Sequence, residues 1–358
     1  MTIRIETMKG PLSDAKLQGI CETFGNHDHR FAQIELNRNF FNENPAGYSI
    51  HSFAMDGDRA IGHYSIIPIK VIHKDRELLS GKGEALYLDP IYRNGTVKVD
   101  NKKVHIAVEM MNQTQILADQ ELLEPQHVIT RKAVQRILRR LGSKIVEYNT
   151  PLLHFITNPF HENKQNKTLK QKLGVLGLFT IQRFLLFMVR LVFFWVEKPE
   201  ISTTKNEFFA KNMAIYHKES CKIAKDKWLI SRDMETMQWM HDSGLLDLFF
   251  FSDDPTAFVI IKKGHHPEVL FWAMEERRWG DYWAMLLKII DHYSDSGPGM
   301  VISFPQEVYS NSRPLLRRFL YLCGFIPKPV KTLVALKSQD KDLGQKESVY
   351  FDRLFFIF

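Results

Sequence analysis

The sequence predicts an α/β protein of the α+β kind with two similar halves, each a mixed and mostly antiparallel sheet flanked by helices. Its 358 residues are enough for roughly two domains of ordinary size. Hydrophobic residues at 44% and charged residues at 25% are values of folded globular chains. A strand meander, a helix, a strand, a helix and a strand are predicted twice in this order, which indicates a tandem.

The first half begins with one strand and two helices. These are predicted at 2–6, 13–24 and 30–41. Three strand-like runs follow at 48–55, 60–73 and 78–88. Asp56-Gly57-Asp58 separates the first two runs and is a strong signal for a hairpin turn, so we expect an antiparallel meander.

Two helices and a strand complete the first half, which we expect to span residues 1–160. Apolar residues recur at helical spacing between Val104 and Leu122, which predicts a long helix. Residues 131–141 form a second predicted helix that is strongly basic, and Gly142 ends it as a C′ glycine. Residues 145–156 are then predicted as a strand.

The linker, assigned to 161–201, has the most unusual composition in the chain. Residues 161–172 are lysine-rich, and an apolar run from Gly174 to Val196 is long enough to span a bilayer. Arg183 and Arg190 lie within this run, and an arginine at a membrane centre costs about 2.5–3.5 kcal/mol on insertion scales. Three interpretations stay open: a linker helix packed between the halves, a helix in the membrane interface formed by 165–196, and a true span.

The second half, expected at 202–358, repeats the order of the first. Helices are predicted at 205–211 and 232–241, and strands at 246–251, 257–263 and 269–274. A helix at 281–293, a strand at 300–304, a helix at 313–322 and strands at 330–336 and 349–358 complete it.

Charge and cysteine content narrow the choice of partners and compartment. The net charge of +7 favours anionic partners such as nucleotide cofactors or membrane surfaces. Nucleic acid is a less favoured partner, because the basic helix lacks interleaved aromatic residues. Cys21, Cys221 and Cys323 lie far apart without metal-ligand spacing, so we expect reduced thiols, no metal and a cytoplasmic protein. The N-terminus also lacks the apolar region of a signal peptide.

Three segments of the first half carry a resemblance to a known family. They are Asn44-Pro45-Ala46-Gly47, the run from Asp56 to Tyr64, and the run from Gly83 to Gly95. In this order they resemble a subgroup of tandem GNAT-type N-acyltransferases, and the halves are also similar to the aminoacyl transferases that build peptidoglycan bridges. The resemblance implies two GNAT-like domains and acyl transfer from acetyl-CoA, or a related acyl-CoA, to an amine.

The resemblance also implies where acetyl-CoA binds. The backbone at Tyr87, Leu88 and Asp89 would hold the acyl carbonyl, and the turn of Arg93, Asn94 and Gly95 would hold the pyrophosphate. This turn is degenerate, because its glycine comes one position early and a second glycine is absent. Val97 and Val99 are more typical of a strand than of a phosphate loop, and the next helix is expected to start near Asn101. An alternative source of positive charge in place of backbone amides is the set of lysines Lys98, Lys102 and Lys103.

In the second half, the equivalent segment 275–281 has the adjacent carboxylates Glu275 and Glu276, a further one at Asp281, and one glycine. We therefore expect only the first half to bind CoA.

Acyl transfer needs a base for the amine and an acid for the departing thiolate. Glu84 lies four residues before Leu88, so we expect the same strand face for both and take Glu84 as the candidate base. Tyr148 is the candidate acid. His63 and Tyr64 are the candidate residues of the acceptor cleft.

Three functions stay open from the sequence. The first is an N-acyltransferase that acetylates an amino group of a small molecule such as an amino sugar or a cell-envelope precursor, in the cytoplasm or peripherally on the inner face of the membrane. The second is a degenerate GNAT-like binding or scaffold protein without CoA activity. The third is an aminoacyl-tRNA-dependent transferase, which would use the basic helix at 131–141.

Overall fold

A computed structural model provides the structure of the chain. It describes residues 3–25, 31–74, 76–130, 132–156, 168–195, 199–203, 209–224, 226–254, 256–263, 267–273, 279–295, 301–305, 314–340, 343 and 349.

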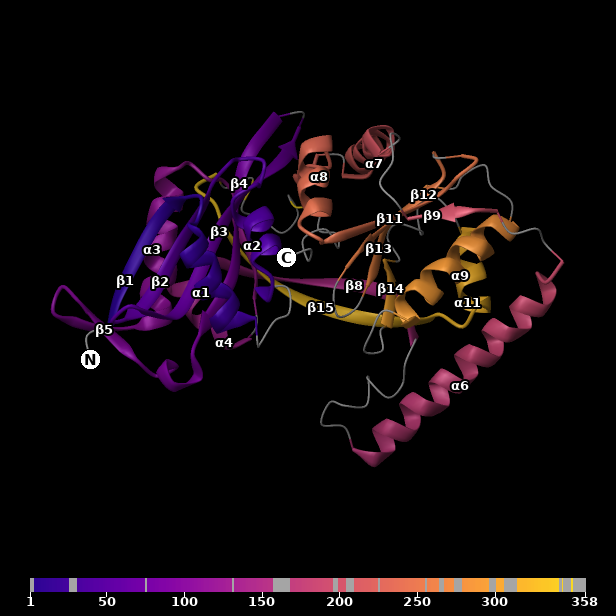
Figure 1. Cartoon of the computed structure of the whole chain (residues 1–358), viewed down its shortest axis with the longest axis horizontal. Coiled ribbons are helices and arrows are strands. Elements are labelled where there is room, and N and C mark those ends of the chain that lie inside the picture. Colours follow the sequence, from indigo (N-terminus) through magenta and orange to yellow (C-terminus); the bar gives the residue numbers. More distant parts are fainter. Residues whose placement is uncertain are drawn as a thin grey trace.

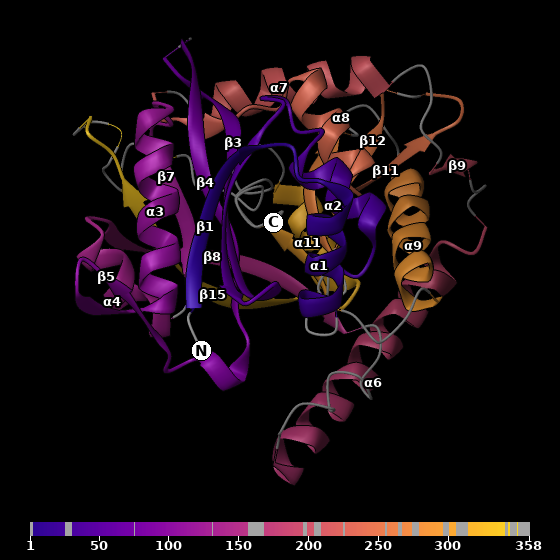
Figure 2. The same cartoon turned by 60° about the vertical axis from the view of Figure 1, so that its left-hand side comes forward.

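The first half contains a long meander with helices on both faces. Its elements are β1 (Ile3–Gly10), α1 (Asp14–Phe24), α2 (Ile34–Phe41), β2 (Ser49–Asp56), β3 (Arg59–His73), β4 (Arg76–Leu88), β5 (Thr96–Val99), β6 (Lys102–His105), α3 (Ile106–Gln120), β7 (Gln126–Thr130), α4 (Lys132–Arg140) and β8 (Lys144–Ile156). α3 covers one face of β1–β4, and α1 and α2 cover the other (Figure 2).

The second half follows a long helix and repeats the same order with shorter strands. The long helix is α6 (Leu169–Val192), and the elements that follow it are β9 (Ile201–Ser202), α7 (Phe209–Ala224), β10 (Leu229–Ile230), α8 (Met234–Asp242), β11 (Leu246–Phe251), β12 (Phe258–Lys262), β13 (Glu268–Ala273), α9 (Trp279–Asp295), β14 (Val301–Pro305), α11 (Pro314–Leu322) and β15 (Ile326–Lys337). The predicted α/β class, with a mostly antiparallel sheet flanked by helices, is confirmed.

The halves exchange their last strands within one continuous sheet (Figure 1). The strand order is β1-β2-β3-β4-β7-β15-β8-β14-β13-β12-β11-β9, and β10 pairs with β3. β15 of the second half therefore lies between β7 and β8 of the first half, and β8 in turn lies beside β14. As a result, segments that are separate along the sequence share one hydrogen-bonded ladder.

Three apolar clusters fill the layers on the two faces of the sheet. One lies between α3 and β2–β4 and includes Ile50, Ile66 and Met110. A second lies between α9, α11 and the strands of the second half. The third spans both halves, because α1, α2, α7 and α8 pack on the same face; Phe40 of α2 stacks on Trp239 of α8 with a centroid distance of 5.9 Å.

Several predicted elements differ from those in the structure. β7 was not predicted, since Gln126–Thr130 is short and has polar residues at both ends. α3 begins at Ile106 with His105 as its N-cap, not near Asn101, because residues 96–105 form the β5–β6 hairpin. The predicted helix at 205–211 is described from Phe209 and continues to Ala224. Of the predicted strand at 349–358, only Val349 lies within the described residues, where it bridges to Trp228.

Candidate functional site

A β-bulge interrupts β4 close to its end. Ala85 and Leu86 of β4 together lie opposite Tyr64 of β3, so one residue of β4 has no partner in this ladder. Ala85 has a φ of +53°, a left-handed conformation that is uncommon for a residue with a side chain. A bulge of this kind releases backbone groups from the ladder and changes which way the following side chains point.

The bulge decides which side chains of β4 share a face. Glu84 lies opposite Ser65, and Leu88 lies opposite Gly62, on the other side of the bulge. Since side chains alternate along β3, Glu84 faces α1 and α2, while Leu88 belongs to the cluster under α3. The expectation that Glu84 and Leu88 share a face is therefore wrong, because the extra residue shifts the alternation by one. Tyr87, whose ring meets Phe24 of α1 at 4.3 Å, shares the face of Glu84 instead.

The same part of β4 has an open edge toward β7. β4 and β7 pair in parallel only at Gly81–Gln126 and Lys82–His127. Across the part of the chain that the structure describes, no strand pairs with this edge of β4 after Lys82. An open strand edge can pair with another extended chain that carries amide groups. The bulge lies directly on this edge.

Glu84 forms an ion pair with a lysine of its own strand. Lys82 Nζ lies 2.5 Å from Glu84 Oε1, the Lys82 side chain is fully buried, and the Glu84 side chain keeps 12% of its exposure. Lysine is seldom buried to this degree unless it is paired. The ion pair holds the Glu84 carboxylate in one orientation on the α1 face of β4. Burial and the Lys82 charge together also keep the pKa of nearby His127 well below its ordinary value.

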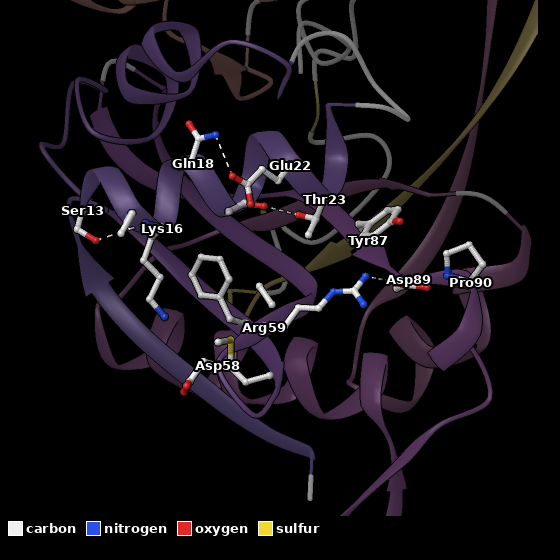
Figure 3. A pocket seen from close by; sticks show the side chains of 15 residues that line it. Ser13, Lys16, Gln18, Glu22, Thr23, Asp58, Arg59, Tyr87, Asp89 and Pro90 are labelled. Atoms are coloured by element: carbon white, nitrogen blue, oxygen red, sulfur yellow. Dashed lines mark hydrogen bonds and ion pairs between the residues drawn. The ribbon is translucent and has the colours of Figure 1, made fainter. Parts of the chain in front are cut away.

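A cavity of about 890 Å³ opens between α1 and the ends of β2, β3 and β4 (Figure 3). Its lining carries both signs of charge. The cations are Lys16 and Arg59, and the carboxylates are Glu22, Asp58 and Asp89. Arg59 reaches across the cavity and pairs with Asp89 at 3.0 Å, and Tyr87 contributes its ring to the wall (Figure 3). A cavity of this size is large enough for a small molecule.

His63 and Tyr64, the predicted acceptor residues, point to opposite faces of β3. His63 is fully buried and its Nε2 lies 3.1 Å from Nδ1 of His51, inside a cage formed by Phe24, Phe41 and Phe53. Burial, with a smaller effect from Lys16, lowers the pKa of His63 to about 3, so the ring is neutral at pH 7. His63 is not among the residues that line the cavity.

Tyr64 lies against β4 on the α3 side of the sheet. A Cβ placed on Gly83 would lie 2.3 Å from the Tyr64 hydroxyl, so this glycine allows the close approach. Burial raises the pKa of Tyr64, and the Glu84 carboxylate adds to the effect. The acceptor role of His63 and Tyr64 stays a prediction.

The turn predicted to hold the pyrophosphate is joined to the β5–β6 hairpin. The Gly95 N–H donates to Tyr92 O at 2.7 Å, and Gly95 O accepts from the Ile106 N–H at 3.2 Å. The side chain of His105 accepts from the Ala107 N–H at 3.2 Å and contacts Arg93 O through its other nitrogen at 2.6 Å. The first amides of α3 are thus bonded within the protein.

The other predicted cofactor residues surround this turn. Arg93 and Asn94 are exposed, Leu88 is buried, and the Asp89 N–H donates to Ile61 O at 2.8 Å. Lys98, Lys102 and Lys103 are exposed on the hairpin. The role of each of these residues in cofactor binding stays a prediction.

Tyr148, the candidate acid, lies on β8 opposite Thr332 of β15. Two strands, β7 and β15, separate β8 from β4 in the sheet order, so Tyr148 and Glu84 lie on opposite sides of the opening between β4 and β7. The second-half segment predicted to be unable to bind pyrophosphate, 275–281, lies mostly outside the described residues.

Sequence reasoning missed three parts of this site. Lys82 could have been found from the sequence, because a lysine two residues before Glu84 in the same strand lies on the same face as Glu84. No sequence pattern indicates that Lys16 and Glu22 of α1 belong to the site, since only the packing of α1 over β2 and β3 brings them to the cavity. No pattern indicates the bulge either, because alanine does not indicate a left-handed conformation.

Comparisons with known proteins identify the fold. No protein-family model matches the sequence, and no curated protein matches it either. Among solved structures, a tandem GNAT protein from the clavulanic acid biosynthesis pathway, determined without AcCoA, aligns over 94% of this chain and 98% of its own, with 7% identity and a TM-score of 0.52. This chain therefore has a tandem GNAT-type fold, as the sequence predicted.

Two further solved structures align at lower scores. A GCN5-related N-acetyltransferase from Kribbella flavida aligns over 95% of this chain and 72% of its own, with 10% identity and a TM-score of 0.49. A putative acetyltransferase from Pyrococcus horikoshii aligns over 96% of this chain and 92% of its own, with 9% identity and a TM-score of 0.49.

Proposed function

We propose that this protein is an N-acyltransferase that moves an acetyl or related acyl group from acyl-CoA to an amino group of a small molecule. The observation that carries the proposal is the bulge at Ala85–Leu86, located on the edge of β4 that β7 leaves open. Backbone N–H groups released by a bulge are suited to hold the oxygen of a thioester carbonyl. The tandem GNAT-type fold supports acyl transfer as the general reaction.

The donor fits the open edge by the chemistry of its pantetheine arm. That arm is an extended chain with amide groups, and such a chain can pair with a strand edge as an added strand does. The acyl carbonyl would then lie at Tyr87, Leu88 and Asp89, next to the bulge. The diphosphate would extend toward Arg93, Asn94 and Gly95, where the exposed hairpin lysines supply positive charge.

The proposed reaction joins the acceptor nitrogen to the acyl carbon and breaks the carbon–sulfur bond. Glu84 takes the proton that the amine must lose, directly or through a water, and its pairing with Lys82 keeps the carboxylate oriented. Tyr148 gives a proton to the departing thiolate. For both residues to act, the sulfur must lie in the opening between β4 and β7, and the Tyr148 hydroxyl must reach it from β8, which β7 and β15 separate from β4 in the sheet order.

The acceptor is proposed to enter through the cavity under α1. Its carboxylates, from Glu22, Asp58 and Asp89, attract an ammonium group, and Lys16 and Arg59 offer hydrogen bonds to hydroxyl or anionic groups. An amino sugar or another polar cell-envelope precursor combines these features. His63 and Tyr64 would act behind this cavity, as parts of the β3 wall that supports Tyr87 and Gly83.

One observation favours the alternative of a GNAT-like binding or scaffold protein without CoA activity. The first two amides of α3 are bonded to Gly95 O and to the His105 side chain, so they are not directed at a ligand. A helix N-terminus binds a phosphate through such amides when they are unpaired. A protein with this closed terminus would rely on side-chain charge alone or would bind no CoA.

Titration of the full chain with acetyl-CoA by calorimetry separates the two functions. N-acyltransfer requires binding in the micromolar range, and Arg93→Glu should weaken it at least tenfold because a phosphate contact becomes a repulsion. Arg76→Glu, at the other end of β4 and equally exposed, is the matched control and should leave the affinity unchanged. Absence of binding up to millimolar acetyl-CoA would contradict acyl transfer from acyl-CoA and leave the scaffold protein and the aminoacyl-tRNA-dependent transferase.

A truncated donor tests which part of acyl-CoA is recognised. S-acetyl-pantetheine keeps the thioester and the amide groups but lacks the phosphates. Thiol release from both donors, measured with a panel of amino sugars, should occur with a higher KM for the truncated donor and a similar kcat. Equal KM values would contradict a phosphate site at the hairpin while leaving acyl transfer intact.

A further inference from the structure

Helix α6 presents a continuous apolar face to the outside of the molecule. It is 24 residues long, and only Gln182 and Leu186 are buried along it. The outward face contains Leu173, Ile181, Phe184, Phe187, Met188 and Leu191, each between 45% and 60% exposed. Figures 1 and 2 both show α6 extending beyond the body of the protein. A patch of this extent on a soluble surface marks an interaction site.

Hydrogen bonds fix the rotation of α6, so the outward face cannot turn inward. The Gln182 side chain donates from Nε2 to His154 O and accepts at Oε1 from the Ile156 N–H, both at 3.0 Å. Gln182 thereby continues the backbone ladder of β8 and is 1% exposed. Gly324, at a φ of +92°, lets the end of α11 approach this residue closely. The apolar residues opposite Gln182 are thus held toward the outside.

The helix is long and apolar enough to cross a membrane by composition, but its anchoring excludes a lipid-surrounded span for this fold. The most apolar stretch of 18 residues along this helix is only 11% buried. One side of the helix is bonded to β8 and packs near α11, and that side cannot face lipid at the same time. The free side alone is available, which matches a helix that lies flat in an interface.

The charges on α6 identify the kind of surface that would cover this face. No Asp or Glu occurs from Leu169 to Trp195, whereas Lys170, Lys172 and Arg190 are exposed. Lys172 and Arg190 are 18 residues, or five helical turns, apart, so they lie along the same border of the apolar face. Trp195, 88% exposed just after the helix, is a residue type enriched at the headgroup level of bilayers.

We propose that α6 docks the protein onto an anionic lipid bilayer, with its apolar face in the headgroup–acyl boundary and its cations on lipid phosphates. The proposal does not depend on acyl transfer. A second copy of the chain is a poorer occupant, because pairing two α6 helices would bring together lysines and arginines without any carboxylate on the helix to oppose them. Anionic lipid supplies the missing negative charge along with the apolar environment.

Vesicle flotation of the full chain tests the proposal. The protein should float with phosphatidylcholine vesicles that contain phosphatidylglycerol, and at least tenfold less with phosphatidylcholine alone. Phe184→Glu combined with Met188→Glu should reduce flotation at least tenfold, because it places two charges in the apolar face. Both side chains are exposed, so the fold should survive, as shown by an unchanged unfolding temperature. Ile91→Glu, a charge added at an apolar residue 84% exposed in the first half, is the matched control and should float like the native protein.

Charge reversal separates lipid attraction from simple hydrophobic adhesion. Each surface lysine or arginine contributes roughly fivefold to binding on anionic membranes. Lys172→Glu combined with Arg190→Glu should therefore lose at least tenfold on anionic vesicles and change little on neutral ones. Equal flotation of native and Phe184→Glu/Met188→Glu protein would overturn the proposal. So would a lipid-free dimer that the same double substitution dissociates, because a second copy would then occupy the face.

Discussion

The two halves of the molecule have the same strand order, but they place different side chains on the same face of the sheet. In the first half, the face under α1 and α2 carries the buried titratable groups His51, His63 and Lys82, together with the half-buried Glu84. In the second half, the strands of the shared cluster carry Leu248, Phe250, Phe258 and Ile260 instead. The last strand of each antiparallel meander, β4 or β13, contains a bulge. Each of these strands also pairs in parallel with its neighbour in the sheet: β4 with β7, and β13 with β14.

The difference teaches which features of the repeat are structural and which suggest chemistry. The bulge and the parallel pair occur in both halves, so the fold provides this backbone geometry twice, and the side chains around it decide which half can use it. Buried charge is costly unless it is paired, and a purely structural strand needs none of it. Each half has one carboxylate–lysine pair on this face, Glu84 with Lys82 and Glu268 with Lys262, but only the first half adds buried histidines, which points to β3 and β4 as the functional strands. The second half contributes support, through the apolar cluster and through β15.

The largest expected effect comes from separating the halves. A fragment of residues 1–203 lacks β15, so β7 loses its ladder with Leu333–Lys337 and β8 loses its longest partner. We expect this fragment to lose the whole free energy of folding, typically about 5–15 kcal/mol for a domain. Circular dichroism and two-dimensional NMR of the fragment should show an unfolded chain.

Mixing that fragment with residues 204–358 during refolding is the control, and it should restore the native spectrum. The full chain should also unfold in a single transition. A fragment 1–203 that unfolds cooperatively on its own would show that the first half folds without β15. This result would contradict the conclusion that the second half supports the first.

A smaller effect is expected from two matched carboxylates. Glu84 on β4 pairs with Lys82, and Glu268 on β13, also buried, lies 3.8 Å from Lys262. Glu84→Gln should lower kcat by about 100-fold or more with little change in the affinity for acetyl-CoA, because a base is removed. Glu268→Gln should leave kcat within twofold. Both substitutions weaken an ion pair, so each should reduce the free energy of unfolding by about 1–3 kcal/mol.

Steady-state thiol release and urea unfolding of the two variants provide the comparison. Equal loss of kcat in both variants would mean that the loss reflects stability and not chemistry. A native kcat in Glu84→Gln would remove this residue from the reaction and leave the cavity residues as the remaining candidates for a base.

The parts predicted well from sequence are those fixed by local contacts. The β2–β3 hairpin follows from Asp56-Gly57-Asp58, and Gly57 indeed has a φ of +61°. Gly142 ends α4 with a φ of +88°, as expected for a C′ glycine. The tandem order follows from hydrophobic periodicity, which each segment carries within itself.

The parts that were missed depend on contacts between distant segments. The exchange of β15 and β8 depends on pairing between residues 144–154 and 326–336, and no local pattern specifies it. Glu84 was chosen because it lies on the strand that resembles a cofactor strand. The prediction that it shares a face with Leu88 was wrong, because the bulge follows Glu84 immediately. The cavity depends on how α1 packs over β2 and β3, so Lys16 and Arg59 could not be grouped from their positions in the chain.

The last expected effect is a gradual change of stability with pH, and it sharpens the contrast between the two halves. Burial holds the pKa of His51 well below its ordinary value, with a contribution from His63, and burial lowers that of His63 to about 3. Below the unfolded value of about 6.5, the unfolded chain binds protons that the folded chain does not, so stability falls as pH falls. Each histidine should cost roughly 1.4 kcal/mol per pH unit in that window, and for His63 the loss continues to about pH 3.

Replacing both rings removes this dependence without leaving one polar group unmatched. The hydrogen bond between His51 and His63 is mutual, so His51→Leu combined with His63→Leu removes donor and acceptor together. Urea unfolding between pH 7 and pH 4.5 should then show that the free energy of unfolding depends less steeply on pH. Unfolding of the double variant should take up about two protons fewer than unfolding of the native protein. His292→Gln, a partly exposed histidine of the second half, should keep the native slope. If the free energy of unfolding of the double variant depends on pH as steeply as that of the native protein, the acid sensitivity arises from other residues. The buried histidines would then not be what distinguishes the first half from the second half.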